Sequence, residues 1–156
     1  MTGQEAAEMV RRERAYLMNI LRAFPRDKGG FIPAPGMMTA AQQVHHLART
    51  VRWFAEGAFG TGFDMDFEKM EADNRAEITW DKAMVTIDAA YDDFSAFLET
   101  LGDGELDAPM PANPIFPEGT PRAAVIIAQG DHTAHHRGAL SVYMRLLGVV
   151  PPMVYG

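Results

Sequence analysis

The sequence predicts an all-helical fold, a four-helix bundle in a single domain covering residues 1–156. Four long stretches have apolar residues three or four positions apart, and Pro- and Gly-rich segments separate them. No segment between them has the pattern of a strand. With 156 residues, 47% of them hydrophobic, the chain is long and apolar enough to bury one core. Because all the connections are long, this pattern leaves the topology open.

The first predicted helix covers residues 4–24. Its apolar face consists of Ala6, Val10, Leu17, Leu21 and Phe24. Pro25 and the Gly29-Gly30 pair then end the helix. Glu13 lies within the apolar stripe, where a carboxylate is unusual. It either accepts a hydrogen bond from a metal-ligating imidazole or reaches solvent at the edge of the helix.

The second predicted helix starts at Thr39 and continues to about residue 59. Thr39 and Gln42 have the spacing of a capping box, in which both side chains bond backbone N–H groups at the helix start. Gly60 or Gly62 is expected to end the helix. The irregular segment that follows is predicted to hold a short helical turn around residues 66–73.

The third and fourth predicted helices lie on either side of a proline-rich segment, residues 108–119. The third covers residues 80–101, with Gly102 expected as the glycine just beyond its end. For the fourth, Thr120 is the predicted N-cap and Pro121 the first helical residue. Its expected end is at Gly148, before the prolines at 151 and 152.

Two histidines of the fourth helix occupy its apolar stripe. His132 and His136 are four residues apart and therefore share a face of the helix. The stripe as a whole consists of Val125, Ala128, His132, His136, Ala139, Tyr143 and Leu146. Imidazoles in such core positions are costly unless something satisfies their nitrogens, as a metal ion would. A buried cluster of hydrogen-bonded histidines is the alternative.

A third ligand is expected from the second helix, which carries two adjacent histidines. His46 is on the face of Trp53, beside apolar neighbours, whereas His45 lines up with Arg49 and Arg52 on a charged, solvated face. His135 falls to the side of the apolar stripe of its own helix and is not expected to bind metal. The predicted site is therefore His46, His132 and His136, a three-histidine set that leaves coordination positions open for water or substrate.

Composition and charge exclude several classes of partner. The net charge of −7, from 14 basic and 21 acidic residues, disfavours nucleic acid. No run of 18 apolar residues could cross a membrane, and the amino-terminal segment is charged too early for a signal peptide. The chain has no cysteine, which excludes disulfides and thiolate ligands and fits a reducing compartment. A cytoplasmic protein is expected.

The histidine-containing segments resemble those of the DinB-like superfamily, also called YfiT-like metalloenzymes. Its last helix carries a His-x-x-x-His-Arg-Gly motif followed by an apolar run and a proline-rich tail, as in GDHTAHHRGALSVYMRLLGVVPP (residues 130–152). The motif corresponds here to His132, His136, Arg137 and Gly138. The position after the glycine is often Gln in the family, whereas it is Ala139 here.

The resemblance extends to the second helix, where the family has its remaining histidine ligand, then an aliphatic residue and later an aromatic pair. In AAQQVHHLARTVRWF these are His46, Leu47 and Trp53-Phe54. The resemblance implies a bundle of up-down-down-up topology with a long crossover between the second and third helices. It also implies a divalent ion, zinc or nickel, and a homodimer.

The expected activity is that of a divalent-metal-dependent enzyme acting on a small molecule. The resemblance implies a thiol-dependent transferase, or a hydrolase. Independently of it, three neutral imidazoles would leave the charge of an ion uncompensated and able to activate a thiol or water. Without cysteine in the chain, any thiol must come from a low-molecular-weight cosubstrate. Asp131, Arg137 and Tyr143, with Glu13, are candidates for contacts to substrate or to the imidazoles. The alternatives are a non-catalytic, stress-related bundle that binds a metal or ligand, and a metal-free bundle.

Overall fold

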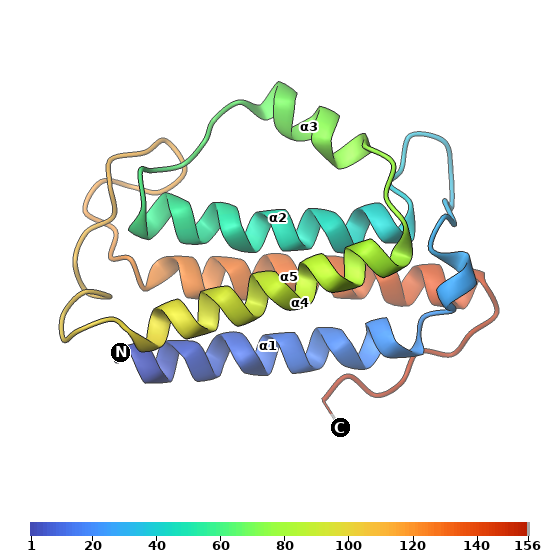
Figure 1. Ribbon diagram of the computed structural model, residues 1–156, viewed down its shortest axis with the longest axis horizontal. Coiled ribbons are helices and arrows are strands. Elements are labelled where there is room, and N and C mark those ends of the chain that lie inside the picture. The colour runs from blue at the N-terminus through green and yellow to red at the C-terminus, as the bar shows by residue number, and fades with distance from the viewer. Residues whose placement is uncertain (156) are drawn as a thin grey trace.

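The computed structural model describes residues 1–155 and is all-helical, as predicted (Figure 1). Within those residues the β-structure is limited to one isolated bridge, between Pro109 and Pro121. The helices are α1 (Gly3–Ala23), the 3₁₀ turn η1 (Arg26–Lys28), α2 (Ala40–Phe59), α3 (Phe67–Arg75), α4 (Trp80–Glu99) and α5 (Ala124–Leu146). None of the described helices is long and apolar enough to cross a membrane.

Helices α1, α2, α4 and α5 form a four-helix bundle. Both α1 and α2 pack against α4 and α5. Figure 1 shows α1 and α5 running in one direction and α2 and α4 in the other, so that the segment from α2 to α4 returns along the length of the bundle. This long connection carries α3, which lies outside the bundle and packs on α2.

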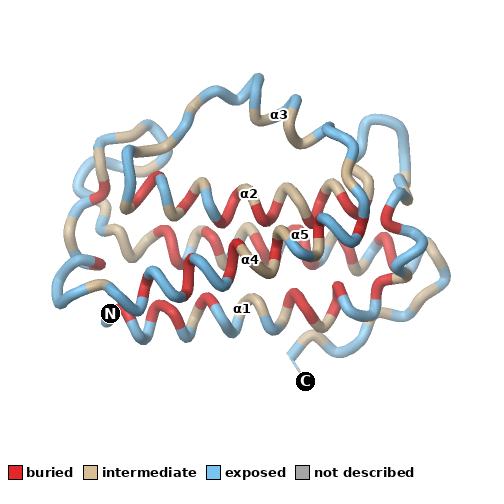
Figure 2. The backbone as a smooth tube through the Cα atoms, viewed as in Figure 1, coloured by how far each residue is buried: buried red, intermediate tan, exposed pale blue. Residues whose placement is uncertain are grey.

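The apolar core lies between the four long helices. Figure 2 shows their buried positions facing inward, whereas α3 has no buried residue. The largest fully buried apolar residues of these helices are Tyr91, Tyr143, Leu17, Ile20, Leu21, Leu47, Ile87, Leu98, Leu140 and Met144. Helix α3 is therefore held mainly by polar contacts, while burial of apolar surface holds the bundle.

Two predicted helix ends are confirmed. The Thr39 hydroxyl accepts from the backbone N–H of Gln42 at 3.1 Å, and the Gln42 amide oxygen accepts from the N–H of Thr39 at 2.8 Å. At the end of α5, Gly148 has a φ of +78°, which favours glycine, and its N–H donates to the Arg145 carbonyl at 3.0 Å. The N–H of Val149 bonds Met144 in the same turn.

Two other predicted ends were wrong. Helix α5 begins at Ala124, four residues after the predicted cap Thr120. Residues 120–123 pair instead with the proline-rich segment, where the Thr120 carbonyl accepts from Met110 and the Arg122 N–H donates to Ala108. The expected terminal glycine of α4, Gly102, has no positive φ, because the helix already ends at Glu99, before Thr100.

Candidate metal centre

His46 on α2 and His132 and His136 on α5 converge at the interface of these two helices. One ring nitrogen from each residue lies within 4.8 Å of the other two. The ring centroids are 5.1 Å apart for His46 and His132, 4.8 Å for His46 and His136, and 4.7 Å for the pair on α5. The residues that the sequence nominates as ligands therefore meet at one point.

The geometry fits a metal ion, with a small adjustment. Three nitrogens at 2.0–2.1 Å from one ion lie roughly 3.0–3.5 Å from one another. The Nε2 atoms of His46 and His132 are 3.1 Å apart, which is within this range. All three nitrogens already lie within 4.8 Å of one another. Side-chain rotations that move the ring nitrogens by about 1 Å would therefore bring the remaining pairs into range.

Two amide side chains orient the rings from behind. The Nδ1 of His46 lies 3.1 Å from the Oδ1 of Asn74 on α3, and the Nδ1 of His136 lies 2.9 Å from the Oε1 of Gln43 on α2. An amide oxygen can only accept, so each Nδ1 carries the proton and each Nε2 keeps its lone pair. The rings are thus held in the tautomer that a metal requires at Nε2.

Sequence reasoning did not identify Gln43 or Asn74. Gln43 precedes His46 by three residues, so its position on the same face of α2 was a usable signal. Asn74 belongs to the long connection and reaches His46 only because α3 folds back over α2. Arg49 supports that contact by donating to Asn74 at 3.2 Å and to Asp73 at 2.7 Å.

Burial keeps the three histidines neutral. It lowers the pKa of His136 to about 3 and that of His132 to about 4, and the neighbouring imidazoles contribute in the same direction. Burial also lowers the pKa of His46, against the opposing effect of its bond to Asn74. Only a neutral imidazole has a free lone pair, so the unprotonated cluster is ready to bind an ion near neutral pH.

The other two histidines do not join the cluster. His135 is exposed and its ring lies against that of His136, with centroids 4.9 Å apart. His45 is half-buried rather than fully solvated as expected, and its Nδ1 is buried without a hydrogen-bond partner within the described residues. The packing of α4 and the segment before it against α2 explains this, since His45 lines a shallow pocket with Ile78 and Lys82.

The remaining candidate residues lie elsewhere. Arg137 faces α1, where its guanidinium contacts Glu13 at 3.4 Å, and both residues line a cavity of about 340 Å³ together with Asp131. The hydroxyl of Tyr143 donates to the Met38 carbonyl in the α1–α2 connection, at 2.9 Å. Glu13 thus contacts an arginine, and the acceptors for the imidazoles are amides. A role for these four residues in substrate binding stays a prediction.

Comparison with known protein families gives a match over most of the chain. The family model of the DinB superfamily matches residues 9–140, which is most of the chain. The chain belongs to the DinB superfamily. The match includes all three clustered histidines, so this DinB protein carries its candidate metal site within the region that defines the family.

A solved structure shows the same fold. The DinB chain is similar to the crystal structure of a DinB-like protein, YjoA, from Bacillus subtilis, with a TM-score of 0.69 and 21% sequence identity. The similarity covers 96% of this chain and 97% of the other. No curated protein matches the DinB chain. The comparisons therefore establish its family and fold, and the histidine cluster is compatible with metal binding.

Proposed function

We propose that the protein is a divalent-metal-dependent enzyme acting on a small molecule, and specifically a transferase that uses a low-molecular-weight thiol. Hydrolysis is the related alternative. The convergence of three neutral imidazoles from α2 and α5 carries this proposal. The set of candidate ligands found among the described residues contains no carboxylate, so these ligands would not offset the charge of the ion.

A zinc or nickel ion held by the three Nε2 atoms would lower the pKa of a thiol or water at the site. The residues of the chain orient the imidazole rings and leave the cluster accessible. Gln43 and Asn74 hold two of the rings by their Nδ1 protons. His46 and His132 are only half-buried, which leaves one side of the cluster open to a small molecule.

The thiol itself must come from a cosubstrate, because the chain has no cysteine. Transfer would join the sulfur of the thiol to an electrophilic carbon, with release of the thiol proton and of the leaving group. The three imidazoles are the ligands in this proposal, and the chain offers no nucleophilic sulfur of its own.

Metal content is the first test. Protein purified without a histidine tag is expected to hold about one zinc or nickel ion per chain, and His132→Ala and His136→Ala should reduce this to background. His135→Ala is the matched control, since it removes the same side chain from the same helix outside the cluster. Unchanged metal content in both cluster variants would overturn the proposed site.

Turnover distinguishes an enzyme from a non-catalytic metal-binding bundle. A panel of thiols with alkyl and aryl electrophiles should give thioether product only with metal-loaded protein, and chelation should abolish the rate. Full metal occupancy without turnover of any thiol and electrophile in the panel would favour the binding protein instead.

A further inference from the structure

We propose that the electrophile of this reaction carries a flat aromatic ring, which packs on an aromatic surface beside the metal centre. This inference rests on the proposed function and assigns the substrate class of the same site. The surface, called the aromatic wall below, consists of Trp53, Phe54, Phe63 and Phe116.

The aromatic wall starts at a metal ligand. The ring of Phe54 lies 6.5 Å from that of His132, edge to face, and Trp53 lies 5.2 Å from Phe54. Phe63 continues the surface at 4.6 Å from Trp53. Phe116 follows at 5.8 Å from Phe63, so aromatic rings extend without interruption from the histidines to the proline-rich loop.

Three segments distant in sequence build the wall. Trp53 and Phe54 belong to α2, Phe63 to the connection before α3, and Phe116 to the proline-rich loop. Phe54 is buried, whereas the other three rings are half-buried and keep part of their surface exposed. Exposed ring faces next to a reaction site can accept another flat ring by stacking.

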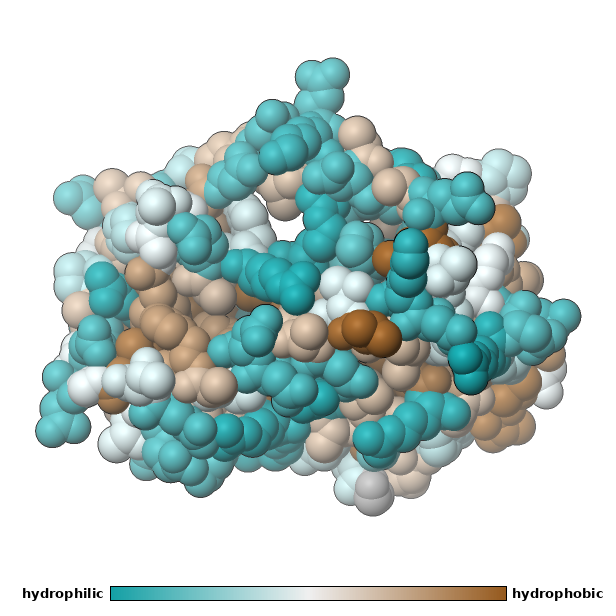
Figure 3. All heavy atoms as spheres, in the orientation of Figure 1, coloured by the Kyte–Doolittle hydropathy of each residue, from teal (hydrophilic) through white to brown (hydrophobic). Residues whose placement is uncertain are grey.

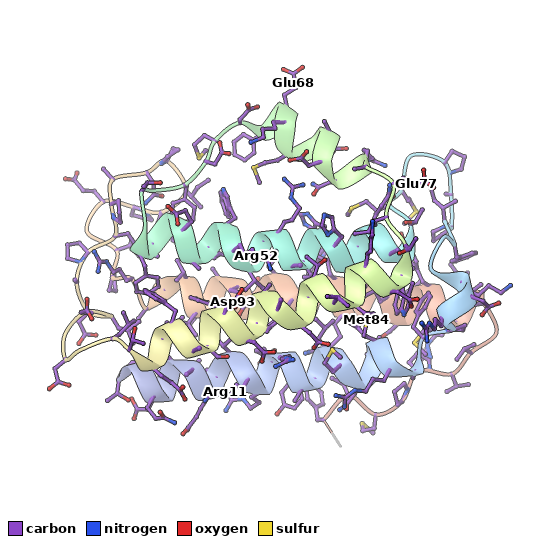
Figure 4. The ribbon with its side chains drawn as sticks, in the orientation of Figure 1. Arg11, Arg52, Glu68, Glu77, Met84 and Asp93 are labelled. Atoms are coloured by element: carbon purple, nitrogen blue, oxygen red, sulfur yellow. The ribbon has the colours of Figure 1, made fainter. Side chains whose placement is uncertain are left out.

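The wall borders a cavity at its loop end. Figure 3 shows an opening between the atoms of α3 and those of the bundle, and Figure 4 shows Glu68 on α3 pointing away from it into solvent. The cavity, of about 310 Å³, lies within the proline-rich loop and is lined in part by Phe116, Met110 and Asn113. Phe116 therefore has free volume beside it, at the loop end of the wall.

A glycine in α2 makes room for the wall. Gly57 is buried, and a Cβ placed on it would lie 2.3 Å from the Cδ1 of Phe63, closer than atoms can approach. Glycine is unfavourable inside a helix, but at this position it allows the Phe63 ring to pack directly against the backbone of α2. The indole N–H of Trp53 donates to the Asp64 carbonyl at 2.8 Å and holds the same segment in place.

The chemistry of the wall selects the ligand. None of its four side chains is charged, and only the indole has a polar atom, already used by Asp64. A neutral aromatic electrophile fits these faces better than a charged or purely aliphatic one. For an aryl halide, the thiol sulfur would bond the ring carbon, the carbon–halogen bond would break, and halide and proton would leave.

Binding can be measured without turnover through Trp53. The chain has two tryptophans, and Trp80 is stacked on Phe24 away from the site, so Trp80→Phe leaves Trp53 as the single tryptophan, which can be excited selectively. Titration of this variant with the unreactive ring compound 2,4-dinitroaniline should give saturable quenching. Gly57→Ala should weaken the apparent affinity by about fivefold, because it displaces Phe63.

The matched control is Gly138→Ala. A Cβ added at this helical glycine would meet no side chain or neighbouring segment within 4 Å among the described residues, so the affinity should be unchanged. Phe116→Leu is the second wall variant, for the case in which Gly57→Ala does not fold, and it should also weaken binding. Quenching that does not saturate, or equal affinity in the wall variants and the control, would overturn the inference.

Selectivity provides the second readout. With one thiol and metal-loaded protein, the ratio of kcat/KM for 1-chloro-2,4-dinitrobenzene to that for iodoacetamide should fall about fivefold in the wall variants. An unchanged ratio would contradict the aromatic subsite while leaving thiol transfer intact. Saturable ring binding without turnover of either electrophile would instead remove the proposed function and retain the subsite.

Discussion

The two sides of α5 differ in how they accommodate polar groups. Toward α2, His132 and His136 meet His46, and the rings are uncharged and open to an ion. Toward α1, the guanidinium of Arg137 lies over the rings of Tyr16 and Tyr155, at 5.6 Å from each, and contacts Glu13. The first side concentrates unused lone pairs, and the second neutralises a charge. Residues adjacent in one motif therefore have separate roles.

Acid should affect the histidine side most strongly. In metal-free protein, the rings are neutral in both folded and unfolded chains well above pH 6.5, the ordinary imidazole pKa. As the pH falls, the unfolded chain takes up protons that the buried cluster resists, with pKa values of about 4 for His132 and about 3 for His136. The free energy of unfolding should therefore drop by several kcal/mol between pH 6.5 and 3, since each unit of difference in pKa between the folded and unfolded chain is worth about 1.4 kcal/mol.

Urea unfolding across this pH range, with chelator present, measures the loss. His135→Ala should show the same acid dependence, because its ring is exposed and outside the cluster. A free energy of unfolding that stays constant from pH 6.5 to 4 would mean that burial does not lower the pKa values of these imidazoles in the folded chain.

The amide acceptors of the histidine side should affect metal affinity, whereas Glu13, on the side of α5 that faces α1, should not. Gln43→Leu and Asn74→Ala each remove the acceptor of one Nδ1 proton, and we expect zinc affinity to fall about 10–100-fold. Competition with a chromophoric chelator measures this. Glu13→Gln is the control, since Glu13 contacts Arg137 and not a histidine. An equal loss of zinc affinity in Glu13→Gln would remove the distinction between the two sides.

Arg137 should contribute to stability without affecting the metal. Its side chain is only 9% exposed, and Arg137→Leu loses both the ion pair and the stacking on two tyrosines. Glu13 is 24% exposed and can hydrate once unpaired, so we expect a loss of about 1–2 kcal/mol in the free energy of unfolding. Urea unfolding gives this value, and metal content should remain at the parent level. Loss of the ion from Arg137→Leu would contradict the separation.

The smallest effect is expected from the two glycines of α5. Gly138 has open space around it, so Gly138→Ala should raise the free energy of unfolding by about 0.5–1 kcal/mol through helix propensity alone. Gly130 faces α1, where an added Cβ would meet Glu13 Cγ at 3.4 Å, and its gain should be smaller. Thermal unfolding of the two variants compares them directly, and a larger gain at Gly130 would contradict the contact.

Helix periodicity and capping residues allowed much of the fold to be predicted. The Thr39–Gln42 capping box and the Gly148 end are local features, in which residues a few positions apart satisfy the backbone groups of a helix end. The start of α5 was not predictable in this way. Thr120 has the sequence of a cap, but its backbone pairs with Met110, and that pairing depends on how the proline-rich segment folds.

The three histidines could be nominated from the sequence because spacing on a helix determines which face each side chain occupies. Their convergence, the amide acceptors Gln43 and Asn74, the association of Glu13 with Arg137 and the aromatic wall were decided by tertiary structure. Each of these joins residues from different segments, brought together by burial of the apolar faces of the bundle. Local periodicity encodes the direction of a side chain, whereas only packing selects its partner across the interface.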